Sequence, residues 1–247
     1  MHKLESQIYK SKLQTTSEEF KKNKESMLGM LEEIDTLLDE AEAGGGPDHQ
    51  KRLAARGKLP VRERIFNFLD PDSPFLEISG LAGYKSDYPV GGGAVAGIGV
   101  CSGIECIIFA NDPTVLAGAM HYYSVKKWMR SMAIARDCRI PFIQFVESAG
   151  GDLRPRGAMS AGAMGHFAES GRQFYEITEL SKLNIPTVSV TFGTATAGGA
   201  YQPGMSDYNI FVKDQADVAL AGPPLVQMAT GEISSREEIG GAKMHAE

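Results

Sequence analysis

Three features that define large classes of protein are scarce or missing in this sequence. Only three cysteines are present, Cys101, Cys106 and Cys138, too few and too odd in number for a disulfide framework. No run of about 18 apolar residues occurs, and residues 1–30 lack the apolar segment of a secretory signal. The chain is therefore expected in a reducing compartment without a membrane partner. That compartment is the cytoplasm, or the mitochondrial matrix if the chain is the mature form of an organellar protein.

An excess of basic residues is also missing. The 247 residues include 25 basic and 31 acidic side chains, which give a net charge of −6. Nucleic-acid binding normally requires clustered lysine and arginine without offsetting acids, so nucleic acid is not an expected partner. The hydrophobic content of 43% predicts a globular chain of one large or two small domains rather than a disordered polymer.

The common catalytic motifs that rely on side chains are absent as well. The sequence contains no Gly-x-Ser-x-Gly elbow, no Walker loop and no His-Glu-x-x-His pair. Its five histidines are scattered, so neither a zinc site nor a Ser-His-Asp arrangement is supported, and no metal is expected. These histidines are His2, His49, His121, His166 and His245. The chemistry is therefore expected to use backbone amides.

Residues 1–47 are predicted to form a helical arm. Thr16 followed by Glu19 is typical of a capping box at the start of a helix, and the glycines and proline at 44–47 end it. Seven apolar residues recur at helical spacing: Met27, Met30, Leu31, Ile34, Leu37, Leu38 and Ala41. This stripe suits packing against the chain's own domain and contact with another subunit equally well.

From residue 75 onward, short β-rich segments alternate with glycines and helices. Strands are predicted at 75–80, 94–101, 104–110, 142–147, 187–192 and 208–212, and helices at roughly 117–137 and 166–183. Strands that come first as a pair and then singly between helices predict an α/β core with a mixed or largely parallel sheet.

Gly91-Gly92-Gly93 superficially offers the glycines of a dinucleotide-binding motif. That motif requires a helix after the glycines, whereas a strand-like segment follows here. We therefore reject the dinucleotide interpretation and expect these glycines to begin a twisted hairpin.

Two further glycine loops follow apolar strands, at residues 146–155 and 193–207. Because glycine has no Cβ and adopts dihedrals that other residues avoid, Gly150 and Gly151 can aim backbone N–H groups at one oxygen atom. In the second loop, Ala197 to Ala200 leave room for a ligand to lie against bare backbone. Two such loops at strand ends favour an oxyanion site, although each alone is also typical of an ordinary turn.

Five segments of the chain resemble the carboxyltransferase β subunits of biotin-dependent acyl-CoA carboxylases, in particular the methylcrotonyl-, geranyl- and propionyl-CoA carboxylase group. They are RGKLPVRERI (56–65), FANDPTV (109–115), VESAGGDL (146–153), TATAGGAYQPGMSD (194–207) and AGPPLVQMATGE (221–232). The resemblance covers about residues 50–247. It implies a crotonase-like superhelix of ββα units, preceded by the helical arm.

The resemblance also implies roles for particular residues. The oxyanion loop of the family falls on Ser148 to Gly151, so Gly150 and Gly151 inherit the catalytic role. The substrate-binding stretch falls on Ala195, Thr196, Ala197, Gly198, Gly199, Ala200 and Tyr201. Arg56, Lys58 and Arg62, together with Arg64, are candidates for contacts to the CoA phosphates, or else form a solvated patch. Ala149 and Asp152 depart from the family pattern, and Asp152 is unfavourable beside an enolate unless it points away or pairs with Arg154 or Arg156.

The implied activity is carboxyl transfer to an acyl-CoA. Carboxybiotin on a carrier subunit would supply CO2, with a biotin carboxylase as a further partner. Residues 48–247 would form the N-terminal domain, cut at its C-terminal end, because the chain stops within a Gly-Gly-Ala-x-x-His signature that begins at residue 240. The missing C-terminal half would come from a partner subunit in a homo-oligomer. A biotin-dependent decarboxylase α subunit and a non-catalytic acyl-CoA-binding scaffold are the alternatives.

Overall fold

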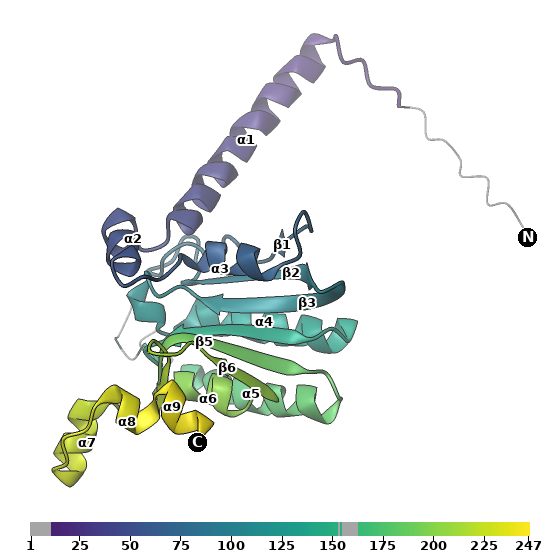
Figure 1. The fold of residues 1–247 in the computed structure, drawn as a ribbon. Coiled ribbons are helices and arrows are strands. Elements are labelled where there is room, and N and C mark those ends of the chain that lie inside the picture. The colour runs from purple at the N-terminus through teal and green to yellow at the C-terminus, as the bar shows by residue number, and fades with distance from the viewer. Residues whose placement is uncertain (1–10, 153, 155–162) are drawn as a thin grey trace, which may run out of the picture.

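The computed structural model describes residues 11–152, 154 and 163–247 (Figure 1). Its α-helices are α1 (Glu18–Ala43), α2 (Pro47–Ala54), α3 (Val61–Phe68), α4 (Tyr122–Cys138), α5 (Ala163–Lys182), α6 (Tyr201–Gly204), α7 (Pro223–Thr230), α8 (Arg236–Gly240) and α9 (Ala242–Ala246). Its strands are β1 (Leu76–Glu77), β2 (Ala94–Cys101), β3 (Ile104–Asn111), β4 (Phe142–Ser148), β5 (Thr187–Thr196), β6 (Tyr208–Phe211) and β7 (Asp217–Ala219). Short 3-10 turns lie at Leu116–Gly118 and Ala197–Ala200.

The strands form one mixed sheet in the order β1-β2-β3-β4-β5-β6, with β7 also paired to β5. The β1, β2 and β3 pairings are antiparallel, and those from β3 onward are parallel. This arrangement agrees with the prediction of a strand pair followed by single strands between helices. It also brings the carboxyl ends of β4 and β5 to one edge of the sheet.

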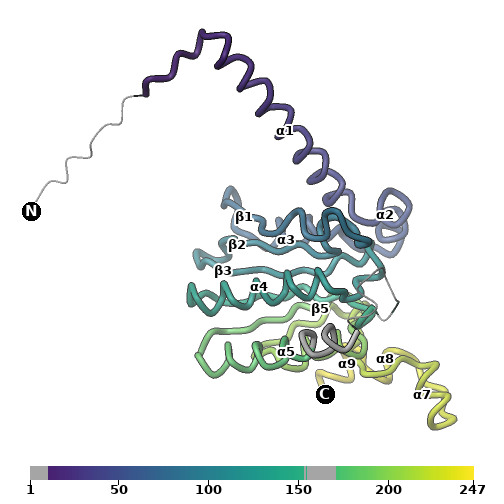
Figure 2. The backbone as a smooth tube through the Cα atoms, turned by 180° about the vertical axis from the view of Figure 1, so that it is seen from behind, coloured from purple at the N-terminus to yellow at the C-terminus, as the bar shows by residue number. Residues whose placement is uncertain are grey.

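Helices cover both faces of the sheet. Figure 2 shows α4 and α5 crossing one face, where Ile107 and Phe109 of β3 pack with Trp128 of α4. On the opposite face, Ile108 of β3 packs with Ile65 of α3. Successive residues of a strand point to opposite faces, so a central strand covered on both sides has to be apolar almost throughout. This requirement explains the continuous apolar segment from 106 to 110.

Gly91, Gly92 and Gly93 precede the β2–β3 hairpin, as predicted, with φ angles of 86°, 66° and 62°. The carbonyls of Gly91 and Ala94 accept hydrogen bonds from the ammonium of Lys127, at 3.0 and 2.6 Å. Lys127 is 2% exposed, and this burial lowers its pKa to about 8. A buried cation on α4 therefore holds the start of the hairpin.

Helix α1 extends away from the sheet (Figure 1). The predicted cap at Thr16 is wrong by one residue, because Ser17 takes the extended conformation and its hydroxyl accepts the Phe20 N–H at 3.2 Å. The helix ends at Ala43, as the glycines predict. A Cβ on Gly45 would lie 1.9 Å from the Thr114 carbonyl oxygen, so only glycine allows this close approach between the arm and the domain.

The predicted helix at 117–137 begins later than expected, at Tyr122. Leu116 and Ala117 have φ angles of 52° and 54°, outside the α-helical region, and Met120 pairs with Gly151 in an isolated bridge. Tertiary pairing with the loop after β4 therefore prevents helix in this stretch. Strand ends also differ, since β1 is only two residues long and β5 continues to Thr196. Strand β7 and the short helices α2, α3, α6, α7, α8 and α9 were not predicted.

Candidate functional site

The two glycine loops that follow β4 and β5 lie against each other. The parallel register pairs Ser148 with Ala195. A Cβ on Gly150 would lie 2.8 Å from the Thr196 carbonyl oxygen, and a Cβ on Gly199 would lie 3.1 Å from the Ser148 side chain. Glycine at both positions therefore lets the two loops approach, and the sheet edge carries bare backbone rather than side chains.

The turn at Gly150 is held from one side by Met120. Gly150 has a φ of 92°, a conformation suited to glycine. Its carbonyl accepts the Met120 N–H at 2.7 Å, and the Met120 carbonyl accepts the Asp152 N–H at 2.8 Å. In a parallel bridge of this kind, the N–H of the central residue points away from the bridging partner. The Gly151 N–H therefore faces away from Met120.

The Gly150 N–H itself has a local partner, because it donates to the Ser148 hydroxyl at 3.2 Å. This distance is at the long end for such a bond. Ala149 donates its N–H to the Ala117 carbonyl at 3.1 Å, which joins the turn to the 3-10 segment at 116–118. Of the two N–H groups predicted to bind an oxyanion, that of Gly150 already makes a weak hydrogen bond within its own turn.

Asp152 pairs with Arg154, one of the two partners expected for it. The guanidinium contacts both carboxylate oxygens, at 2.7 and 3.1 Å, and the carboxylate side chain is only 4% exposed. Arg156, the other expected partner, lies outside the described residues. The negative charge beside the loop is therefore compensated locally.

Sequence reasoning assigned no role to three residues that hold the turn at Gly150. Met120 bonds to the turn directly, and Asn111 and Gln202 contact Met120. The Asn111 amide lies 3.3 Å from the Met120 sulfur, and the Gln202 amide lies 3.6 Å from it. All three residues are buried. Two of them could have been identified from the sequence, because Asn111 is a polar residue at the end of an apolar strand and Gln202 lies within the second glycine loop.

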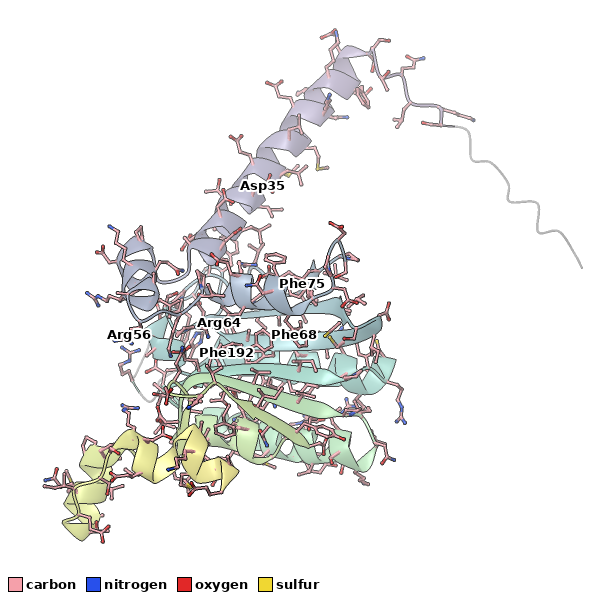
Figure 3. The ribbon with its side chains drawn as sticks, viewed as in Figure 1. Asp35, Arg56, Arg64, Phe68, Phe75 and Phe192 are labelled. Atoms are coloured by element: carbon pink, nitrogen blue, oxygen red, sulfur yellow. The ribbon has the colours of Figure 1, made fainter. Side chains whose placement is uncertain are left out.

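Two of the predicted phosphate-binding cations lie in ion pairs. Lys58 contacts Glu147 at 2.5 Å, and Arg64 contacts the other carboxylate oxygen at 2.8 Å. These side chains are at most 12% exposed. Arg64 also stacks on Phe192, 4.8 Å from the ring centre, and Figure 3 shows the two side by side. The cluster contains two cations and one carboxylate, so it leaves one positive charge beneath the end of β4.

Arg62 also lies in an ion pair, with both of its terminal nitrogens on the Glu77 carboxylate at 2.5 and 3.1 Å. Arg56, the fourth candidate, is exposed and lines an open pocket, and Figure 3 shows it at the outer side of the domain. The structure therefore separates the predicted basic cluster into paired residues and one available residue.

The pocket beside Arg56 has a volume of about 370 Å³. Its lining includes two basic side chains, Arg52 and Arg56, and a histidine, His49. It also reaches Ala117 and Glu147, next to the turn that carries Gly150 and Gly151. Sequence reasoning missed Arg52 and His49, which lie upstream of the segment that carries the resemblance at 56–65.

The predicted substrate-binding residues run along the second loop. Ala195 and Thr196 end β5, Ala197 to Ala200 form the 3-10 turn, and Tyr201 begins α6. A Cβ on Gly198 would meet no atom within 4 Å, so space is open at this point. Tyr201 is 43% exposed, and the centre of its ring lies 4.8 Å from that of Phe174.

The described residues hold no cluster of three or more His, Cys, Asp or Glu side chains placed to bind a metal ion. None of the described helices is long and apolar enough to cross a membrane. The three cysteines are free thiols, and burial raises the pKa of Cys106 to about 11, so this thiol stays protonated at neutral pH.

Comparison with known proteins gives consistent matches. A family model described as the carboxyl transferase domain matches residues 52–247. The chain is 48% identical over 221 residues to a probable biotin-dependent acyl-coenzyme A carboxylase beta2 subunit of Mycobacterium tuberculosis, covering 90% of this chain and 40% of the relative. It is 41% identical to the probable mitochondrial methylcrotonoyl-CoA carboxylase beta chain of Drosophila melanogaster, covering 99% of this chain and 42% of that one.

Solved structures agree. The β subunit of geranyl-CoA carboxylase from P. aeruginosa superposes with a TM-score of 0.81 at 39% identity, covering 97% of this chain and 44% of that one. The transcarboxylase 12S core with hydrolysed methylmalonyl-coenzyme A gives a TM-score of 0.77 at 26% identity. These neighbours confirm the predicted crotonase-like α/β fold. The chain spans about two fifths of the length of the relatives that it matches.

Proposed function

This chain belongs to the carboxyl transferase domain family, and from that membership we propose that it is the acyl-CoA-binding half of the carboxyltransferase in a biotin-dependent acyl-CoA carboxylase. The observation that carries the proposal is the meeting of the two glycine loops at the sheet edge, directly beside a pocket with two arginines. Bare backbone suits a thioester and its pantetheine arm, and the arginines suit the phosphates of CoA.

The exposed arginines beside the loops support a site for the CoA phosphates at this end of the domain. Arg52 and Arg56, with His49, offer donors to phosphate oxygens in the pocket of about 370 Å³. Lys58 and Arg62 act indirectly, since each is held by a carboxylate. The pantetheine arm would run from this pocket along the bare backbone of the two loops, which places the acyl group near Gly198 and Tyr201.

The chain's contribution to the reaction is to stabilise an enolate oxygen. The Gly151 N–H faces away from Met120, and the Gly150 N–H can exchange its long bond to Ser148 for a bond to an oxyanion, which is shorter and stronger. Removal of one preorganised donor of this kind typically costs about 10²- to 10³-fold in rate. Arg154 compensates Asp152, and the cluster at Glu147 adds a net positive charge nearby.

The proposed reaction also requires carboxybiotin and the proteins that bind and deliver it. When bound, carboxybiotin supplies CO2 and a ureido nitrogen that can take the α-proton of the acyl group. We assign its binding to a C-terminal carboxyltransferase half in a partner subunit, and its delivery to a biotin carrier and a biotin carboxylase. The cytoplasm is the proposed location, or the mitochondrial matrix, as the printed name of the Drosophila relative indicates for that protein.

The test compares binding of an acyl-CoA with binding of its thioether analogue, which lacks the carbonyl oxygen. We expect the thioester to bind more tightly to the wild-type chain, and Gly150→Ala to abolish this difference, because a Cβ would displace the turn from the Thr196 carbonyl. The matched control is Gly103→Ala. Gly103 also has a positive φ, 75°, but lies in the distant β2–β3 hairpin turn with open space around it.

Turnover is measured separately, by formation of carboxylated acyl-CoA from carboxybiotin after addition of a C-terminal half from a relative. We expect product in the mixture and none with Gly150→Ala in it. Equal affinity of the wild-type chain for the thioester and the thioether would contradict the oxyanion role. CoA binding without turnover in the mixture would support the scaffold alternative instead.

A further inference from the structure

Helix α1 carries an apolar surface that its own domain leaves largely uncovered. The exposed fractions are 54% for Met27, 53% for Met30, 46% for Leu31, 39% for Ile34 and 40% for Leu38. No residue of the helix is buried. The domain contacts the C-terminal half of the helix, where the Tyr84 hydroxyl donates to Glu33, Leu38 lies against Gly80 and Ala41 lies against Gly91. We call Met27, Met30, Leu31, Ile34 and Leu38 the α1 stripe.

The spacing of the apolar residues matches helix-to-helix packing. Phe20, Met27, Ile34 and Ala41 recur at seven-residue intervals, and Met30 and Leu37 lie three residues after Met27 and Ile34. This is the pattern of a heptad seam, which packs against one other helix. A helix of 26 residues is about 39 Å long, enough for three heptads.

Charge is divided unevenly between the two halves of α1. The half from Glu18 to Gly29 contains three lysines and three acids. The half from Met30 to Ala43 contains six acids and no base, and Figure 3 shows one of them, Asp35, well away from the domain. The lysines are Lys21, Lys22 and Lys24, and the six acids are Glu32, Glu33, Asp35, Asp39, Glu40 and Glu42.

We propose that the α1 stripe is a self-association surface on which α1 of a second copy of this chain packs antiparallel. An antiparallel pair places the lysines of one helix beside the acidic half of the other. A parallel pair would place six acids beside six acids, which is repulsive. The pair is twofold symmetric, so each copy gives and receives the same contacts.

The two kinds of residue contribute differently to this pairing. Burial of the apolar side chains supplies the affinity. Exposed ion pairs are each worth only about 0.2–1 kcal/mol, so the charges select the orientation rather than the strength. The surface lies outside the proposed acyl-CoA site, and its test does not depend on carboxyl transfer.

The first experiment measures the mass of the whole chain in solution by sedimentation over a range of concentrations. We expect a reversible dimer in the wild type and a substantially weaker one in Ile34→Glu. The matched control is Thr36→Glu, which adds the same charge on the opposite face of the same helix and should leave the dimer unchanged. Circular dichroism checks that both variants keep the helix. A monomeric wild type, or a dimer insensitive to Ile34→Glu, overturns the proposal.

The second experiment tests the orientation by disulfide cross-linking, with the exposed Cys138 replaced by serine. In an antiparallel heptad pair, Met30 of one copy lies beside Ile34 of the other, whereas the two Met27 residues are about 15 Å apart along the axis. A mixture of Met30→Cys and Ile34→Cys chains should therefore cross-link, and Met27→Cys alone should not. Cross-linking of Met27→Cys with itself, or no cross-link in the mixture, overturns the antiparallel arrangement.

Discussion

Basic residues within one short segment of this chain, 52–64, have opposite environments. Arg64 is buried and Lys58 is partly buried, and the two share the Glu147 carboxylate, whereas Arg52 and Arg56 are exposed and line an open pocket. A buried cation must be paired to be tolerated, and once paired it has few donors left for a ligand. The comparison teaches that a basic cluster in a sequence is not by itself a binding site, because only those of its residues that stay exposed and unpaired can bind a ligand.

The largest effect is expected for Glu147→Gln, which leaves Lys58 and Arg64 without their counter-charge. Breaking a buried ion pair from one side typically costs about 3–5 kcal/mol, because the remaining charges stay uncompensated in the interior. Urea unfolding measures this loss. Glu63→Gln on the exposed face of α3 serves as the control, with an expected change within about 0.5 kcal/mol. If Glu147→Gln lowers the free energy of unfolding no more than Glu63→Gln does, the ion pairs of Lys58 and Arg64 do not stabilise the fold as proposed.

A second prediction concerns Lys127, a buried cation held by two carbonyls instead of a carboxylate. Burial lowers its pKa to about 8, so above that pH the folded chain loses a proton that the unfolded chain still binds. Stability relative to Lys127→Met should therefore rise from pH 8 towards pH 10, by roughly 3 kcal/mol at most. Urea midpoints across this range measure the difference. Replacement of the exposed Lys182 by Met should leave the pH dependence of stability as it is in the wild type. If Lys127→Met also shows the wild-type pH dependence, Lys127 does not titrate with a lowered pKa and the prediction fails.

The smallest effect on folding is expected in the open pocket. Arg52→Ala and Arg56→Ala should each change the free energy of unfolding by no more than about 0.5 kcal/mol. Each should weaken CoA binding by about tenfold, equivalent to 1.4 kcal/mol, and make it less sensitive to salt. Calorimetry at two salt concentrations measures both, with the exposed Arg130→Ala as the control. If neither variant changes the affinity for CoA, the pocket does not bind the CoA phosphates.

Sequence patterns predicted the frame of this site better than its details. The strands at 94–101 and 142–147 and the glycine-rich turns that follow β4 and β5 are indicated by local periodicity and turn chemistry, although β5 runs four residues further than predicted. The late start of α4 was missed, because Met120 is held by a loop about thirty residues further along the chain. The division of the basic cluster was missed for the same reason, since Lys58 and Arg64 lie 89 and 83 residues from Glu147.

The contact between the two glycine loops also constrains how such an enzyme can be altered. Gly150 fits against the carbonyl of Thr196, and Gly199 fits against Ser148, so the shape of either loop depends on the other. An exchange of one loop with a relative that prefers a different acyl chain would therefore create a clash at the sheet edge. Redesign of acyl preference has to transplant both loops together, as one unit.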